Sequence, residues 1–451
     1  MKVWRRSWIL GCGCPPRGDR NRKAVLDSLG AVGSDYRAGL YAKGFSGDQT
    51  PLTVAELAAF CDVALLHIDH SIRANRRSDG LYHAYNLMRL AGDGIVIRRL
   101  YNMLEGQVAV LSSGALSASE SAALLDALRS SNLYRADQNS YLLYPDRKLP
   151  GFFEKNNIPA AALAKSETLS EMIERGDQRI VVQDLNGVAH FNAAFRNGAL
   201  LKDALEPLGL PDEESAQIIA LYEEVFDHQS FTGRSGTFYK YEGLGCIYWH
   251  MVSKLLLAVQ EVMDRAARAG EDAAVVERLR SQYIEIRKGI GVHKSPEVYG
   301  AMPTDPYSHT PGFAGVQQPG MTGQVKEDLI SRLGEMGVAV EGGQLGFRAH
   351  LVSRGEFLAE ARTFRFYDLD GQERSLELEP GTLAFTTRLV PVVAHQSGPQ
   401  RIEITPADGS RRTVEGLSLD AETSAAVFER TGAVRRLDVF FGFDAGVHVD
   451  R

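Results

Sequence analysis

The amino-acid sequence predicts a mainly α-helical protein with a small β domain at its C-terminal end. From about residue 20 to residue 340, apolar residues recur at helical spacing behind typical cap residues. After about Gly342, short alternating or β-branched runs follow one another, separated by Asp-Gly and Pro-Gly turns. We therefore assign residues 1–340 to a helical domain and residues 341–451 to a β-sandwich.

The helices are predicted from caps and stripes. Thr53 and Glu56 match a capping box at the start of Thr53–Ala74, and one stripe of this segment holds Leu57, Phe60, Ala64, Leu65 and Ile68. Ser117–Arg129 opens in the same way, with Glu120 three residues after its serine. The other predicted helices are Asp212–Phe226, Leu244–Arg268, Glu271–Arg287 and Thr322–Met336, the last of which ends at Gly337.

The C-terminal strands are predicted at regular spacing. Their runs lie at 345–353, 363–371, 374–381, 383–395, 400–409 and 435–442. Several short strands separated by turn residues are typical of a sandwich or jelly roll. We expect about 100 residues of this kind.

Composition excludes some partners. The formal net charge of -7 and the absence of a dense Lys/Arg run argue against a nucleic-acid surface. No stretch approaches the roughly 20 apolar residues of a membrane-spanning helix. The cysteines are too few for a disulfide framework, and we expect free thiols at Cys12, Cys14, Cys61 and Cys246. The apolar run before Cys12 is too short for an export signal, so we expect a cytoplasmic protein.

Five long links between the predicted helices are rich in polar and aromatic residues. They span 75–86, 134–147, 183–192, 232–243 and 293–324. We interpret them as loops gathered at one end of a helical array. Each also has a plain structural alternative: Asp79-Gly80 and Asn186-Gly187 suit turns, and residues 232–243 suit a glycine-rich helix lead-in. His250, inside a predicted helix, is interpreted as a hydrogen-bonded core histidine rather than a catalytic one.

The fifth loop is the most unusual. It holds five prolines and five glycines, so neither helix nor strand persists across it. Ordered loops of this length are usually functional, and its tyrosines argue against disorder. At its end Gly320–Gln324 meets a helix start, where backbone N–H groups form a ready anion site. The alternative is that Thr322 serves as a helix cap alone.

The loop composition points to sugar chemistry. The sequence lacks the G-x-G-x-x-G and G-x-x-x-x-G-K-[ST] nucleotide motifs, H-E-x-x-H and G-x-S-x-G. Aromatic rings pack on sugar C–H groups, while Asn, Gln, Arg and carboxylates bond to hydroxyls. Cleavage of a glycosidic bond needs one carboxylic acid, and inverting hydrolysis needs a second carboxylate about 6.5–9.5 Å away. An anion pocket replaces that second carboxylate when phosphate is the nucleophile.

Two segments resemble the inverting glycoside phosphorylases of the cellobiose phosphorylase type. Pro296–Ala301 is similar to the P-Y-V-Y-S-E segment of that family, and Gly320–Gln324 is similar to its T-G-x-A-G-W phosphate loop. The β part, with Phe357–Phe364 and Leu383–Val393, resembles the family's tail. The likeness covers roughly 290–440 and rests on architecture alone before that. It implies an (α/α)6 six-hairpin toroid followed by a jelly roll.

The chain also departs from that family. It has no G-x-D-W-N-D-G motif, which carries the family's general acid, and Val325-Lys326-Glu327 replaces the tryptophan after the phosphate-loop glycines. The N-terminal β-supersandwich is missing as well. We therefore expect a divergent relative that corresponds to the C-terminal part of a longer protein.

We predict a carbohydrate-active enzyme that cleaves or transfers at a glycosidic bond by inverting phosphorolysis or hydrolysis. The general-acid candidates are, in order, Asp146, Asp137, Glu242 and Asp79. Arg234, Thr322 and Gly323 are expected to hold phosphate. The predicted sugar-binding residues are Tyr82, His83, Tyr241, Trp249, Glu297, Tyr299, Tyr307, His309, Gln317 and Gln318.

The expected partner is an oligosaccharide, with inorganic phosphate as co-substrate and neither metal nor other cofactor. A homodimer is an open expectation, and neither nucleic acid nor membrane is expected. Two other functions stay open. The chain could be a non-catalytic carbohydrate-binding or accessory protein, which the missing acid motif favours, or a sugar epimerase or isomerase on the same toroid.

Overall fold

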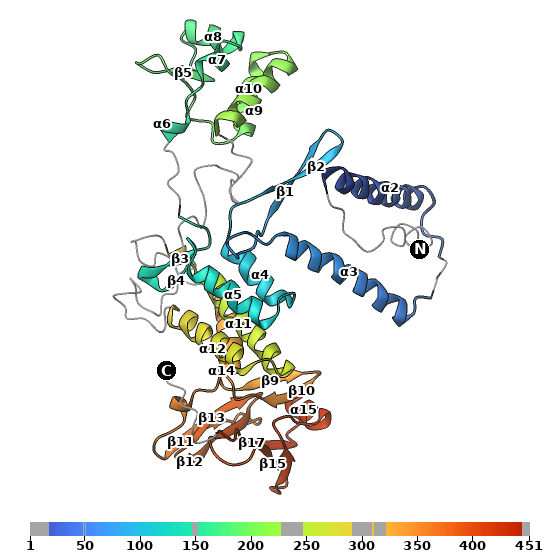
Figure 1. Ribbon diagram of the computed structural model, residues 1–451, viewed down its shortest axis with the longest axis vertical. Helices are drawn as coiled ribbons and strands as arrows, with labels where there is room; N and C mark the ends of the chain where they lie inside the picture. Colours follow the sequence, from blue (N-terminus) through green and yellow to red (C-terminus); the bar gives the residue numbers. More distant parts are fainter. Residues whose placement is uncertain are drawn as a thin grey trace. The chain divides into compact units, whose positions relative to one another are not determined.

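The computed structural model describes residues 18–47, 49, 51–146, 152–226, 247–290, 309–310 and 322–443, with backbone alone at 152–153, 309–310 and 322–324. The chain forms two compact units. Unit 1 comprises Met1–Tyr141 and Ile247–Arg451, and unit 2 comprises Leu142–Cys246. Figure 1 labels most helices and strands of both units.

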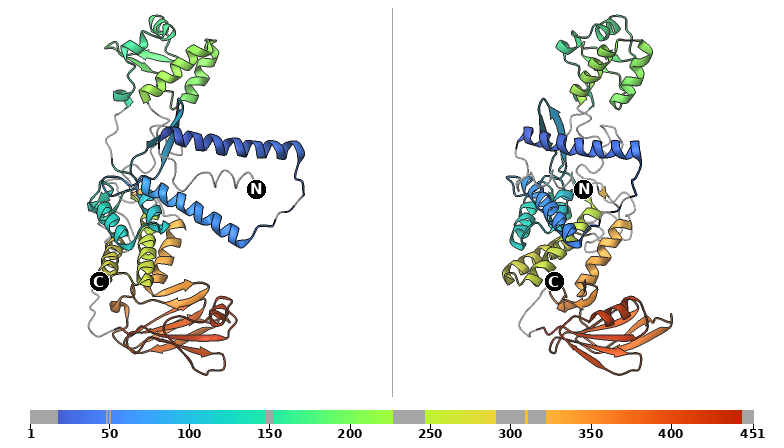
Figure 2. Two further views of the ribbon diagram at one scale, coloured as in Figure 1. Left: turned by 45° about the vertical axis from the view of Figure 1, so that its right-hand side comes forward. Right: turned by 90° about the vertical axis from the view of Figure 1, so that its right-hand side faces the viewer.

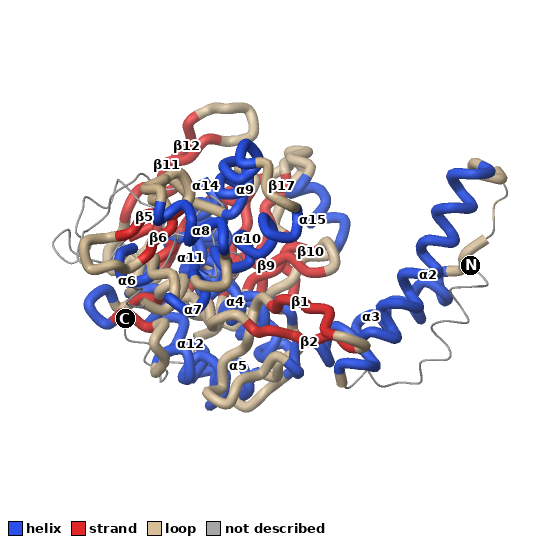
Figure 3. The backbone as a smooth tube through the Cα atoms, turned by 90° about the horizontal axis from the view of Figure 1, so that it is seen from above, coloured by secondary structure: helices blue, strands red, loops and turns tan. Residues whose placement is uncertain are grey.

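The first part of unit 1 is mostly helical. Its elements are α2 (Asp19–Lys43), α3 (Val54–Ala74), β1 (Asn86–Ala91), β2 (Gly94–Arg99), α4 (Leu104–Ser113), α5 (Ala118–Arg129), β3 (Tyr134–Arg135), η1 (Ala136–Gln138) and β4 (Ser140–Tyr141). Both predicted capping boxes are present, at Thr53–Glu56 and at Ser117–Glu120. The hairpin β1–β2, drawn in red in Figure 3, pairs antiparallel from Asn86 opposite Arg99 to Ala91 opposite Gly94 and was not predicted.

The apolar stripe of α3 is exposed, whereas such a stripe usually packs against the core. Leu57, Leu65 and Ile68 are each about half exposed, and no residue of α3 is buried. The cap and the periodicity predicted the helix correctly. They could not show whether a packing partner covers it.

Unit 2 has its own hydrophobic core. Its elements are α6 (Phe152–Lys155), α7 (Ala160–Leu163), α8 (Glu167–Glu174), β5 (Val181–Gln183), β6 (Ala189–Phe191), α9 (Gly198–Leu205), η2 (Glu206–Leu208) and α10 (Asp212–Phe226). Phe191, Tyr222 and Phe226 pack together at its centre, with centroid distances of 4.7–6.3 Å. The predicted turn at Asn186-Gly187 joins β5 to β6, where the Gly187 amide donates to the Asp184 carbonyl at 3.1 Å.

The chain then returns to unit 1 through β7 (Ile247–Tyr248), α11 (Trp249–Ala269), α12 (Ala273–Lys288), β8 (His309–Thr310) and α14 (Thr322–Glu335). Helix α11 packs against α4, α12 and α14 (Figure 2). Its residues Val252, Leu255 and Val259 are wholly buried. It begins at Trp249 rather than at the predicted Leu244, because Ile247 and Tyr248 form a strand; residues 244–246 lie outside the described part.

The β part of unit 1 was predicted in outline. It contains β9 (Val338–Glu341), β10 (Gln344–Phe347), η5 (Arg354–Glu356), β11 (Arg362–Tyr367), β12 (Glu373–Leu378), β13 (Thr382–Thr387), β14 (Val390–His395), β15 (Arg401–Pro406), β16 (Arg412–Glu415), α15 (Ala421–Phe428) and β17 (Val434–Phe440). A five-stranded sheet runs in the order β13-β14-β17-β15-β16, with β14 and β17 parallel and the other neighbours antiparallel. The mainly α chain with a C-terminal β region is thus confirmed.

The inner face of this sheet and helix α15 enclose one core. It includes Val392, Ile402, Val427, Leu437 and Phe441, each almost wholly buried. Helix α15 was not predicted. Residues on both sides of the predicted boundary near residue 340 belong to unit 1. Among the described residues, none of the helices is long and apolar enough to cross a membrane.

Candidate functional site

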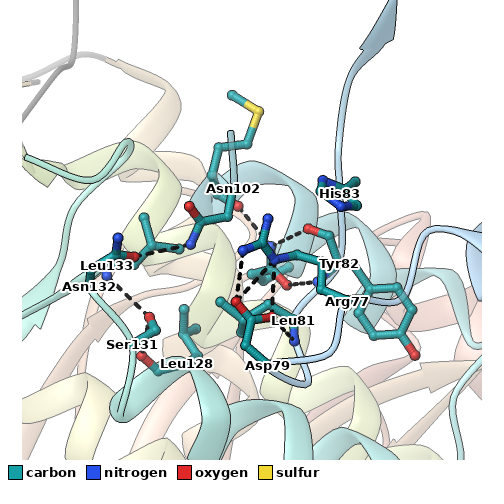
Figure 4. Close-up of polar contacts among 12 residues, drawn as sticks. Arg77, Asp79, Leu81, Tyr82, His83, Asn102, Leu128, Ser131, Asn132 and Leu133 are labelled. Atoms are coloured by element: carbon teal, nitrogen blue, oxygen red, sulfur yellow. Dashed lines mark hydrogen bonds and ion pairs between the residues drawn. The ribbon is translucent and has the colours of Figure 1, made fainter. Parts of the chain in front are cut away.

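The predicted loop at 75–86 is a folded turn tied to helix α4. Arg77 donates two hydrogen bonds to the Asp79 carboxylate, from Nε to Oδ1 at 3.0 Å and from Nη2 to Oδ2 at 2.8 Å. The side chain of Gln107 accepts from the Tyr82 amide and donates to the Tyr82 carbonyl, each at 2.9 Å. Figure 4 shows Arg77 over Asp79 with Tyr82 and His83 alongside. The turn that we had kept as the structural alternative is therefore present.

The Arg77–Asp79 pair bears on the acid candidates. The hydrogen bonds from Arg77 lower the pKa of Asp79. A general acid needs the opposite shift, because it must hold a proton near neutral pH. The pairing with Arg77 therefore argues against Asp79 as a general acid.

A pocket of about 520 Å³ lies beside this turn, between α3 and α4. Its size is within the range of ligand sites. His83 lines it, together with Tyr85, Glu105, Asn75 and residues of both helices. Burial lowers the pKa of His83, and the charge of Glu105 raises the pKa of Tyr85. At neutral pH the pocket therefore presents a neutral imidazole and a neutral phenol.

Other predicted residues are buried or paired. Tyr82 is 4% exposed and Trp249 is 1% exposed, so both rings are packed within unit 1. Asp137 forms an ion pair of 2.9 Å with Arg135. Asp146 is exposed and belongs to unit 2.

Several predicted residues lie outside the described part of the chain: Glu242, Arg234, Tyr241, Glu297, Tyr299, Tyr307, Gln317 and Gln318. For His309, Thr322 and Gly323 the backbone alone is described. Of the cysteines, Cys61 is free and exposed; Cys12, Cys14 and Cys246 are outside the described residues. In the ranges that are described, His, Cys, Asp and Glu side chains form no group of three able to hold a metal.

The starts of α11 and α14 form a second candidate region. Strand β7 pairs with β8, which sets Tyr248 opposite His309 just before α11 begins. On α11, His250 Nε2 lies 3.6 Å from Oε1 of Glu327 on α14. The backbone of Thr322 begins α14, so two places singled out by sequence, His309 and Thr322, lie on elements that adjoin this region.

His250 differs from the hydrogen-bonded core residue that we expected. The Tyr248 hydroxyl lies 3.3 Å from its Nδ1, but its buried Nε2 has no hydrogen-bond partner among the residues that the structure describes. Burial, followed by the charge of Lys254, lowers the pKa of His250. Glu327, which the sequence did not single out as functional, is 4% exposed, and its Oε2 also has no hydrogen-bond partner in the described ranges. The sequence did not single out Glu327 because nothing in a helical sequence pattern distinguishes a buried glutamate from an exposed one.

One family of known proteins matches part of this chain. Residues 149–229 match the model of the GH149 phosphorylase insertion domain 2. The match lies within unit 2, which spans Leu142–Cys246. It relates the chain to a carbohydrate-active phosphorylase family. No curated protein matches the chain.

The structure supports the description of this region as an insertion. The chain leaves unit 1 after β4 and returns to it at β7, and these two strands contact each other. Residues 142–246 therefore form a separate unit between two neighbouring points of unit 1. The glycines and caps of the sequence indicated no such boundary at either end.

Proposed function

We propose that this chain is a carbohydrate-active enzyme that cleaves or transfers at a glycosidic bond of an oligosaccharide, with inverting phosphorolysis as the favoured reaction. The observation that carries this proposal is the match of residues 149–229 to a phosphorylase insertion domain. The matched range also lies within unit 2, Leu142–Cys246, which supports the proposal further.

The proposed architecture is that of the cellobiose phosphorylase type, with an (α/α)6 toroid over residues 1–340 and a jelly roll over 341–451. The packing of α4, α5, α11, α12 and α14 as neighbouring helices is consistent with part of such an array. In this proposal inorganic phosphate is the co-substrate and binds at Thr322, Gly323 and Arg234. No other cofactor is proposed. Asp146, Asp137 and Glu242 are the acid candidates ahead of Asp79.

The test is turnover with and without phosphate. Purified protein is incubated with a panel of glucose disaccharides covering the common linkages, and sugar 1-phosphate and free sugar are both measured. We expect sugar 1-phosphate that depends on added phosphate. Release of free sugar without phosphate would instead show hydrolysis.

A non-catalytic carbohydrate-binding protein is the second candidate. Two of the four acid candidates, Asp79 and Asp137, form ion pairs with arginines, which suits a structural role. Calorimetric binding of a disaccharide without any product, on the whole panel, would establish this alternative and refute the enzymatic one.

A further inference from the structure

Helices α11 and α14 meet along a face that carries polar side chains. His250 approaches Glu327 at one end, and at the other Gly334 lies so close to Gln260 that a Cβ built on the glycine would be 2.0 Å from the amide nitrogen. Residue numbers rise on both helices between the first contact, His250–Glu327, and the second, Gln260–Gly334, so α11 and α14 run in the same direction. Ser253 follows His250 by three residues, which places it on the same face of α11.

Within the described part of the chain, three atoms at the start of this face have no hydrogen-bond partner: Nε2 of His250, which is 3.6 Å from Oε1 of Glu327, Oγ of Ser253 and Oε2 of Glu327. Ser253 is wholly buried and Glu327 nearly so. Buried polar atoms are almost always hydrogen-bonded, because an unpaired one loses its interaction with water and gains nothing. A group of them on two facing helices is therefore evidence for a bound molecule.

The donors and acceptors at this place suit a hydroxyl group. A carboxylate oxygen can only accept, so the partner of Glu327 Oε2 must donate. The Tyr248 hydroxyl, 3.3 Å from Nδ1, can donate or accept, so the neutral ring of His250 can carry its proton on either nitrogen. In the tautomer with the proton on Nε2, that nitrogen is a donor for an acceptor closer than Oε1 of Glu327, which is 3.6 Å away. One hydroxyl oxygen both donates and accepts. Inorganic phosphate near neutral pH carries one or two negative charges, which the carboxylate of Glu327 would repel.

We propose that Glu327 and His250 form a subsite for a sugar hydroxyl at the starts of α11 and α14. The identity of the ligand as a sugar rests on the proposed function. Glu327 is five residues after Thr322, which is about 7.5 Å along a helix at 1.5 Å per residue. The subsite therefore lies within reach of a sugar whose neighbouring atoms meet an anion at the helix start.

The experiment measures binding separately from turnover. The full chain and its variants Glu327→Gln and Glu327→Ala are titrated by calorimetry with the disaccharide that binds the wild type, and separately with inorganic phosphate. Thermal unfolding of each protein is recorded. The matched control is Glu335→Gln, on the same helix, whose residue is similarly buried, at 7% against 4% exposure. Its carboxylate differs in being hydrogen-bonded on both oxygens, by Tyr283, Arg287 and Arg332, whereas Oε1 of Glu327 has only longer contacts, with Lys326 at 3.5 Å and His250 at 3.6 Å.

We expect both Glu327 variants to bind the sugar at least tenfold more weakly while phosphate binding is unchanged. Their unfolding midpoint should equal or exceed that of the wild type, because a buried carboxylate oxygen without a partner costs stability. The Glu335→Gln control should unfold at a lower temperature. A structural glutamate at position 327 would lower the midpoint in the same way.

Other results would overturn the subsite. Unchanged sugar affinity in both Glu327 variants would mean that the orphan atoms bind water only. A loss of phosphate affinity without loss of sugar affinity would assign the residues to the anion instead. If the wild type binds sugar but never forms sugar 1-phosphate, the subsite stands and the phosphorylase function fails.

Discussion

The hydroxyl group of Tyr283 on α12 donates a hydrogen bond of 2.9 Å to Oε1 of Glu335 on α14. Both residues are buried, at 1% and 7% exposure. Arg287 reaches the same carboxylate oxygen at 2.9 Å, so the glutamate joins the two helices through a phenol and a cation. Burial, and then the charge of Glu335, hold the pKa of Tyr283 well above its usual value, so it remains a donor.

We expect Tyr283→Phe to lower the free energy of unfolding by about 1–2 kcal/mol, since one hydrogen bond to a buried charged group is lost while Arg287 remains. Urea unfolding followed by circular dichroism measures this. Tyr367→Phe is the control because Tyr367 is 62% exposed, and its cost should be within about 0.5 kcal/mol. Equal costs at both positions would contradict the role of the Tyr283–Glu335 bond.

The two capping boxes should differ in their effect on stability. Ser117→Ala removes the cap of α5, whose Leu124, Leu125 and Leu128 are buried in unit 1, and should cost about 1 kcal/mol. Thr53→Ala removes the same kind of cap from α3, in which no residue is buried. Its effect on global unfolding should be smaller, because fraying of an exposed helix costs little elsewhere. Chemical denaturation of both variants makes the comparison.

Position 337 requires glycine for two reasons, its backbone conformation and the lack of room for a side chain. Its φ is +84°, and a Cβ there would lie 2.7 Å from the Arg348 carbonyl oxygen and 2.8 Å from Phe441 Cζ. Gly416 has φ +83° with nothing within 4 Å. Gly416→Ala should therefore cost about 1 kcal/mol for the backbone alone, and Gly337→Ala clearly more. Thermal unfolding distinguishes the two, and similar midpoints would show that the clash relaxes.

Asp438 on β17 should make the free energy of unfolding depend on pH in the acidic range. Burial alone would raise its pKa, yet hydrogen bonds from His395 at 2.9 Å and from Arg436 outweigh it and lower the pKa. The folded state then binds fewer protons than the unfolded state, so this stability is present above the unfolded pKa of about 4 and is lost as pH falls through the folded pKa. Asp438→Asn should flatten the stability curve below about pH 4. An unchanged slope would refute the assignment.

Unit 2 should fold by itself. Residues 142–246 expressed alone are expected to unfold cooperatively on heating, because their core of Phe191, Tyr222 and Phe226 is internal to the unit. Phe191→Ala should cost about 3–5 kcal/mol and abolish the transition. Leu185→Ala, at a fully exposed position, should leave it unchanged. A fragment without a heat-absorption peak in calorimetry would contradict an independent unit.

Local signals predicted local structure well. The capping boxes at Thr53 and Ser117 and the turn at Asn186-Gly187 depend on residues within four positions of one another, and each is present. The hairpin β1–β2 escaped prediction because its apolar residues fit a helix as readily as a strand over so short a run. Helix α15 was missed for a similar reason inside a series of strands.

The sequence by itself determined the order of helical and β regions, the caps and the polar character of the loops, because these follow from neighbouring side chains. The tertiary structure alone decided that Gln107 bonds to the backbone of Tyr82, that β4 and β7 contact each other, and that Glu327 is buried beside His250. Those relationships join residues whose distance and burial depend on how elements pack, and neither quantity is encoded in the spacing of residues along the chain.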